Sequence, residues 1–100
     1  MEKSILSLKL FTGEEIISRV NWNLSNDKVY ALENPLALVI GREGNLNFAP
    51  VLFSANPDKL FMLNKNLVVV QSEHLREQIE QGYIQSTSKI VIPTKKIILE

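Results

Sequence analysis

The side chains best suited to catalysis in this chain are one histidine and one pair of adjacent carboxylates. His74 is the only histidine, and a catalytic base needs a nucleophile or an orienting partner, which the sequence does not mark near it. Glu14 and Glu15 lie in a predicted turn, where neighbouring carboxylates ordinarily contact water. There is no cysteine, no glycine-rich phosphate loop, and no HExxH or G-x-S-x-G motif. We therefore expect no catalytic residue, no metal site and no cofactor, and we predict that the protein is not an enzyme.

A second chemistry, the binding of single-stranded nucleic acid, is indicated by two polar loops. Their side chains can contact base edges and phosphates, and the candidate residues are Asn26, Asp27, Lys28, Asn64, Lys65 and Asn66. Trp22 and Tyr30 flank the first loop, and an aromatic ring stacked on a base contributes ~1–3 kcal/mol. An alternative stays open, because loops are commonly polar simply to contact water. Trp22 also ends an alternating run, as a core residue would.

The overall charge limits how strongly a single chain can attract nucleic acid. The 11 Lys and Arg residues balance 11 Asp and Glu residues, and neither half of the chain forms a basic arm. Strong, salt-dependent binding by a monomer is therefore not supported, although several copies side by side can form a positive patch. No apolar run approaches the ~20 residues of a membrane-spanning helix, so we expect no membrane partner and a cytoplasmic location.

The elements that would position the two loops are short β-strands. Apolar residues alternate with others in residues 6–10 and 16–22, and Gly13 between them suits the positive φ of a hairpin turn. Further strand patterns occupy residues 29–32, 36–40, 48–53, 59–63 and 67–71. The Asn34-Pro35 pair predicts a bulge, a bend or an edge position, because Pro35 cannot donate to a strand ladder. We group these patterns into about five short strands, which favour one small, strongly bent, mainly-β barrel.

The pattern changes to helical spacing after the last predicted strand. Leu75, Ile79 and Tyr83 form one apolar stripe, with Ser72 placed to cap the start of the helix and Gly82 its end. We divide the chain into a β-barrel over residues 1–72 and a region of helix and apolar tail over residues 73–100. The tail, residues 84–100, is rich in isoleucine. We expect it to pack on the barrel or on a neighbouring subunit.

Three stretches of the chain together resemble a known family. In order they are LKLFTGEEIISRV, YALENPLALVI and FMLNKNLVVVQSEHL. They resemble the Sm-like proteins of cyanophages and related marine phages, which belong to the Sm and Sm-like ring family, and the resemblance covers most of residues 5–85. The chain departs from that pattern in having its helix after the last strand. It also carries Lys65 where the family has an arginine followed by glycine between the last two strands.

The resemblance implies a five-stranded Sm-like barrel that forms closed homo-oligomeric rings of five to seven subunits, with five favoured. It also implies non-catalytic binding of single-stranded RNA, or of DNA, by the two loops at the pore, and a role in RNA processing in the cytoplasm of the host cell. Residues 59–63 and the run Val68, Val69 and Val70 would supply the paired edges of neighbouring subunits. Two alternatives stay open: a scaffold ring of phage origin with no nucleic-acid role, and a monomeric barrel.

Overall fold

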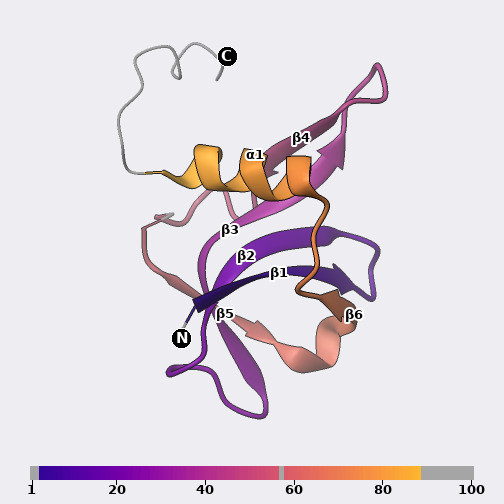
Figure 1. Cartoon of the computed structure of the whole chain (residues 1–100). Coiled ribbons are helices and arrows are strands. Elements are labelled where there is room, and N and C mark those ends of the chain that lie inside the picture. The colour runs from indigo at the N-terminus through magenta and orange to yellow at the C-terminus, as the bar shows by residue number, and fades with distance from the viewer. Residues whose placement is uncertain (1–2, 57, 89–100) are drawn as a thin grey trace.

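A computed structural model of the chain describes residues 3–56 and 58–88 and shows one antiparallel sheet with one helix (Figure 1). Its elements are β1 (Lys3–Leu10), β2 (Glu15–Asn21), β3 (Val29–Ile40), β4 (Leu46–Pro50), β5 (Leu60–Asn64), a 3-10 turn η1 (Lys65–Leu67), β6 (Val68–Ser72) and α1 (Glu77–Thr87). The predicted mainly-β class is confirmed. The strand count is six rather than five, and the predicted placement of the tail beyond Ser88 lies outside the described residues.

The sheet is built around the long strand β3. The order is β4-β3-β2-β1-β6, and β5 pairs with β3 as well. The first half of β3, residues 29–33, pairs with β5, whereas the second half, residues 36–40, pairs with β4. Two short strands therefore share one edge of β3, and the loop of residues 51–59 between them accounts for the additional strand.

The bend in β3 lies at Asn34, as the Asn-Pro pair predicts. Asn34 has φ of 55°, a left-handed conformation that asparagine tolerates better than most residues. The pairing of β2 with β3 shifts register between Ile17 and Arg19 at the same place, which is typical of a β-bulge. The predicted hairpin turn is also present, since Gly13 adopts φ of 106° between β1 and β2.

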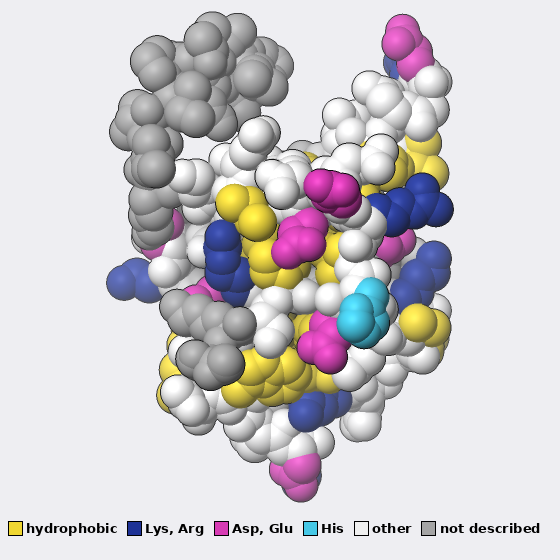
Figure 2. All heavy atoms as spheres, viewed as in Figure 1, with side chains coloured by type: hydrophobic (Ala, Val, Ile, Leu, Met, Phe, Trp, Pro, Cys, Tyr) yellow, Lys and Arg dark blue, Asp and Glu magenta, His cyan; other side chains and the backbone are white. Residues whose placement is uncertain are grey.

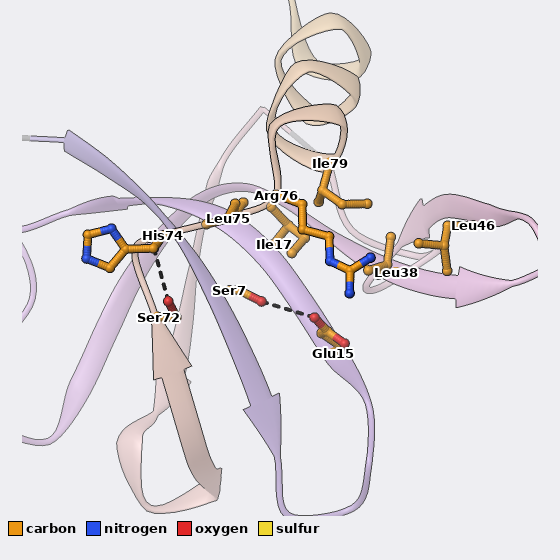
Figure 3. Close-up of a pocket in the computed structure, with 10 residues that line it drawn as sticks. All are labelled: Ser7, Glu15, Ile17, Leu38, Leu46, Ser72, His74, Leu75, Arg76 and Ile79. Atoms are coloured by element: carbon orange, nitrogen blue, oxygen red, sulfur yellow. Dashed lines mark hydrogen bonds between the residues drawn. The ribbon is translucent and has the colours of Figure 1, made fainter.

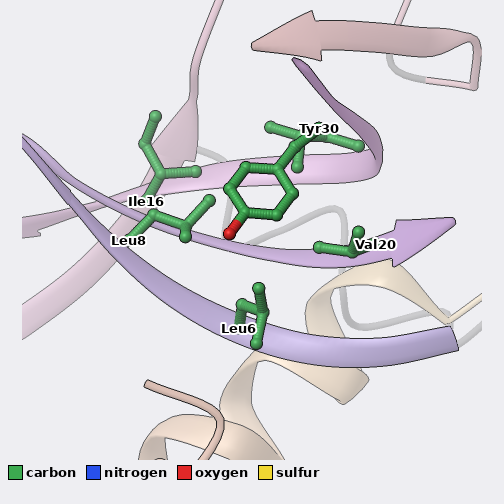
Figure 4. Close-up of a cluster of buried hydrophobic side chains, with 6 residues drawn as sticks. Leu6, Leu8, Ile16, Val20 and Tyr30 are labelled. Atoms are coloured by element: carbon green, nitrogen blue, oxygen red, sulfur yellow. The ribbon is translucent and has the colours of Figure 1, made fainter. Parts of the chain in front are cut away.

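Both faces of the central strands are buried. One face forms the main hydrophobic core, which comprises Leu6, Leu8, Ile16, Val20, Tyr30 and Leu32 (Figure 4). The other face is covered by α1, where Ile17 and Tyr83 are fully buried and the rings of Tyr83 and Phe48 lie 6.4 Å apart. This second layer explains why adjacent residues Ile16 and Ile17 are both buried, although a one-sided sheet would bury only one of them.

The helix is displaced along the chain relative to its predicted position. Ser72 is not a helix cap; it ends β6 opposite Ser7, and α1 begins at Glu77 after an Arg76 that makes no side-chain cap. Gly82 is not a helix end either, because α1 continues to Thr87. A Cβ atom at Gly82 would lie 3.0 Å from the Phe48 ring, so glycine allows the helix to pack closely on β4. No helix in the described part of the chain is long and apolar enough to cross a membrane.

Candidate nucleic-acid interface

The two polar loops predicted to contact nucleic acid lie side by side. The first loop, residues 22–28, joins β2 to β3, and the second comprises Asn64 and the turn η1 before β6. Val29 pairs with Asn64 across β3 and β5, and the backbone N–H of Lys65 donates to the carbonyl oxygen of Lys28 at 2.9 Å. Backbone hydrogen bonds therefore hold the two segments together within one subunit.

The asparagines of both loops use their side-chain oxygens to shape the turns. Asn26 Oδ1 accepts the backbone N–H groups of Lys28 at 2.7 Å and Val29 at 2.9 Å. Asn64 Oδ1 accepts the N–H of Asn66 at 2.9 Å. Such side-chain turns leave the amide NH2 group as the part of the side chain that the turn does not use. Asn26 and Asn64 are both exposed, so each can donate a hydrogen bond to an acceptor on a ligand.

The charged side chains of the loops give a small positive excess. Lys28 and Asp27 are exposed, and Lys65 is half-buried. The Lys65 ammonium lies 4.6 Å from the centroid of the Tyr30 ring, a cation–π contact that places its charge over the junction of the two loops. Two lysines and one aspartate give the two loops of each subunit a formal excess of one positive charge.

The two aromatic candidates have different environments. Tyr30 is 4% exposed, packs edge-on against Trp22 with the ring centroids 5.9 Å apart, and donates its hydroxyl to Gln71. The expectation that Tyr30 stacks on a base is therefore wrong for this structure, because the ring faces are covered by core residues and by Lys65. Trp22 is 39% exposed, and its Nε1 donates to Ser4 Oγ at 3.1 Å. It remains the one aromatic candidate for stacking.

Among the residues considered for catalysis, His74 and Glu15 both line a cavity at the start of α1. His74 is exposed (Figure 2), and its backbone N–H donates to Ser72 Oγ at 3.0 Å. Glu15 accepts the Ser7 hydroxyl at 3.1 Å, and Glu14 accepts the Thr12 hydroxyl. Within residues 3–56 and 58–88, no three His, Cys, Asp or Glu side chains are grouped as metal ligands.

Two surface features were not predicted from the sequence. One is a cavity at the start of α1, and the other is the loop of residues 51–59, in which Phe53 is 86% exposed. The signal for the second was present, because Leu52 and Phe53 stand between Pro50 and the turn formers Ser54 to Asp58. The sequence analysis instead predicted a strand over residues 48–53, whereas β4 ends at Pro50. No family model matches this sequence, and no curated protein matches it either.

Proposed function

We propose that the protein is a non-catalytic, Sm-like ring subunit that binds single-stranded RNA or DNA through the loops at residues 22–28 and 64–66. The observation that carries the proposal is the backbone hydrogen bond from Lys65 to Lys28. It joins two loops that together carry two lysines, two amide donors and the partly exposed Trp22. Phosphate contacts and base stacking are the two interactions that proteins use for single strands.

The strand order supports the Sm-like part of the proposal. Both β4 and β5 pair with the same edge of β3, so they count as two halves of one interrupted strand. The sheet then has the five positions expected of the Sm-like barrel, in the order β4/β5, β3, β2, β1 and β6. The turn η1 connects the two strands at the ends of this order.

The outer strands support assembly into a ring. Among the described residues β6 pairs only with β1, and β5 pairs only with β3. Their side chains include exposed apolar ones: Val69, Val70, Leu60 and Met62 are 59%, 61%, 41% and 56% exposed. A sheet edge of this kind is a ready template for another chain. Pairing β6 of one copy with β5 of the next is head-to-tail and forms a ring when the rotation closes.

A ring would remedy the weak charge of the single subunit. Each copy contributes Lys28 and Lys65 near the same axis, so the positive charge of several copies adds at one end of the ring. With this arrangement, the binding constant should decrease as the salt concentration rises. For each phosphate contacted, its logarithm should fall by about 0.7 for every tenfold increase in salt concentration.

The test is titration of labelled poly-U and poly-A at two salt concentrations, together with mass measurement by light scattering after gel filtration. The double variant Lys65→Ala, Asn66→Ala should weaken binding while the ring mass is unchanged. Lys9→Ala is the matched control, since Lys9 is exposed on β1 and belongs to neither loop. A ring that shows no saturable binding at low salt would instead support the scaffold function. The formal net charge of zero favours that second candidate. A monomer at every concentration would contradict the ring.

A further inference from the structure

A cavity of about 350 Å³ lies between the start of α1 and the hairpin formed by β3 and β4 (Figure 3). We call it the α1 groove. Its apolar wall comprises Ile17, Leu38, Leu46, Leu75 and Ile79. Glu15 and Arg76 also line it, whereas the His74 ring points away from the apolar group in Figure 3. Leu46 is 46% exposed, and Ile40, paired with it across the hairpin, is 74% exposed. The apolar surface therefore continues outward from the groove along the hairpin.

The most exposed aromatic residue among those described belongs to a loop on the opposite side of the molecule. Phe53 is 86% exposed and its neighbour Leu52 is 52% exposed. Both lie in the loop between β4 and β5, residues 51–59, which we call the Phe53 loop and which is described except at residue 57. Figure 1 shows this loop on the left of the molecule, whereas β6 and the start of α1 lie on the right. Complementary features on opposite sides of one subunit suit a head-to-tail contact between copies.

The direction of the strands determines where the Phe53 loop would lie in such a contact. If β6 of one copy continues the antiparallel sheet into β5 of the next, the two strands run in opposite directions. The chain that precedes Leu60 in the second copy then extends past Ser72 of the first. Beyond Ser72 come residues 74–76, which line the α1 groove. The edge pairing therefore brings the Phe53 loop of one copy to the α1 groove of the next.

We propose that Phe53 of one copy inserts into the α1 groove of the next copy and locks the ring. This inference rests on the ring in the proposed function and adds a side-chain contact outside the paired strands. Burying a phenylalanine side chain contributes about 1.5–3 kcal/mol, which is about a tenfold to hundredfold change in the association constant of each interface.

Disulfide trapping tests the contact directly, because the chain contains no cysteine. The double variant Phe53→Cys, Leu46→Cys should form, under mild oxidation, a ladder of covalent oligomers on a non-reducing gel. Within one subunit the two positions lie on opposite sides, so each disulfide must join two copies. The control pair Phe53→Cys, Leu24→Cys places the second thiol on the loop of residues 22–28 and should give no ladder.

Mass measurements on single variants separate this inference from the ring itself. Phe53→Ala and Leu46→Glu should each shift ring dissociation to at least tenfold higher protein concentration, and the double variant should be no weaker than the worse single variant. Leu24→Ala, which removes another exposed apolar side chain (52% exposed), should leave the mass unchanged. If the ring is stable, gives no covalent ladder and keeps its mass in Phe53→Ala, the contact is wrong but the ring is not contradicted. A wild-type protein that is monomeric throughout would overturn both. Circular dichroism of each variant checks that the subunit is folded.

Discussion

The hydroxyl oxygen of Tyr83 lies 2.8 Å from the carbonyl oxygen of Asn34, which is 49 residues away in the chain. The same hydroxyl accepts the backbone N–H of Arg19 at 3.0 Å. Both partners are backbone groups at the register shift between β2 and β3. One side chain on α1 thus satisfies both strands of the bulge and fixes the helix to the sheet. The Arg19 guanidinium covers the ring at 5.1 Å from its centroid and donates to Thr87 Oγ1 at 2.8 Å.

The first prediction concerns loss of this hydroxyl. Tyr83→Phe should lower the free energy of unfolding by about 1–3 kcal/mol, because it removes the acceptor of the Arg19 N–H and the donor to the carbonyl oxygens of Glu33 and Asn34. Urea denaturation followed by circular dichroism measures the change. Tyr30→Phe is the matched control: the hydroxyl of Tyr30 bonds to Gln71, which is exposed and can bond to water instead. An equal loss in the two variants would contradict the special role of Tyr83.

The second prediction concerns alkaline pH. Burial raises the pKa of Tyr83 above its ordinary value of 10.0, and this effect exceeds the opposing effects of the Arg19 hydrogen bond and charge. The folded protein therefore holds the phenol proton more tightly than the unfolded chain does. The resulting stability is fully present below about pH 10 and is lost as the pH rises through the higher folded-state pKa.

Denaturation of the wild type and of Tyr83→Phe from about pH 8 to about pH 11 measures this loss. The stability gap between the two proteins should be constant at the lower end and narrow at the upper end. All other ionisable side chains are the same in both proteins, so their contributions cancel in the difference. If the difference in free energy of unfolding stays constant up to about pH 11, folding does not raise the pKa of Tyr83.

The third prediction concerns the bend of β3. Asn34 has φ of 55°, and the left-handed conformation costs roughly 1–2 kcal/mol for a residue with a Cβ atom, whereas glycine adopts it freely. Asn34→Ala and Asn34→Gly both remove the side-chain amide, so their difference isolates the backbone effect. Asn34→Gly should be more stable than Asn34→Ala by about 1 kcal/mol in thermal or urea denaturation. The opposite order would contradict the bulge geometry.

The fourth prediction uses Trp22, the only tryptophan in the chain. If Trp22 stacks on a base, oligo-uridine should change its fluorescence emission in a saturable way. Trp22→Ala should then weaken binding about 5-fold to 150-fold, the equivalent of ~1–3 kcal/mol per stacked base. Trp22→Phe keeps an aromatic face and should lose much less. If the emission does not change on adding oligonucleotide and the affinity does not change on substitution, Trp22 is not part of the interface.

Several features could be predicted because they depend on neighbouring residues. The alternation in residues 6–10 and 16–22 with Gly13 between them corresponds to β1, β2 and their turn. The bulge at Asn34 could be predicted because Pro35 next to it cannot donate a hydrogen bond to a neighbouring strand. In each case the deciding physics, side-chain alternation or backbone sterics, acts over a few residues.

The helix boundaries and the role of Tyr30 were predicted wrongly because they depend on distant contacts. Ser72 is a good helix cap by residue type, yet pairing with Ser7 keeps it in β6. Tyr30 flanks a polar loop, yet its ring belongs to the core beside Leu8 and Val20. In both, tertiary packing outweighs the local preference.

The sequence by itself determined a mainly-β chain, its turns, its bend and the polar character of two loops, because composition and short-range periodicity encode these properties. Only the tertiary structure decided that the loops at residues 22–28 and 64–66 adjoin through Lys65 and Lys28. It also decided that Ile17 and Tyr83 are buried in a second layer, and that Phe53 and the α1 groove lie on opposite sides. The physical reason is that the curvature of β3 and the docking of α1 set the distances between residues far apart in the chain.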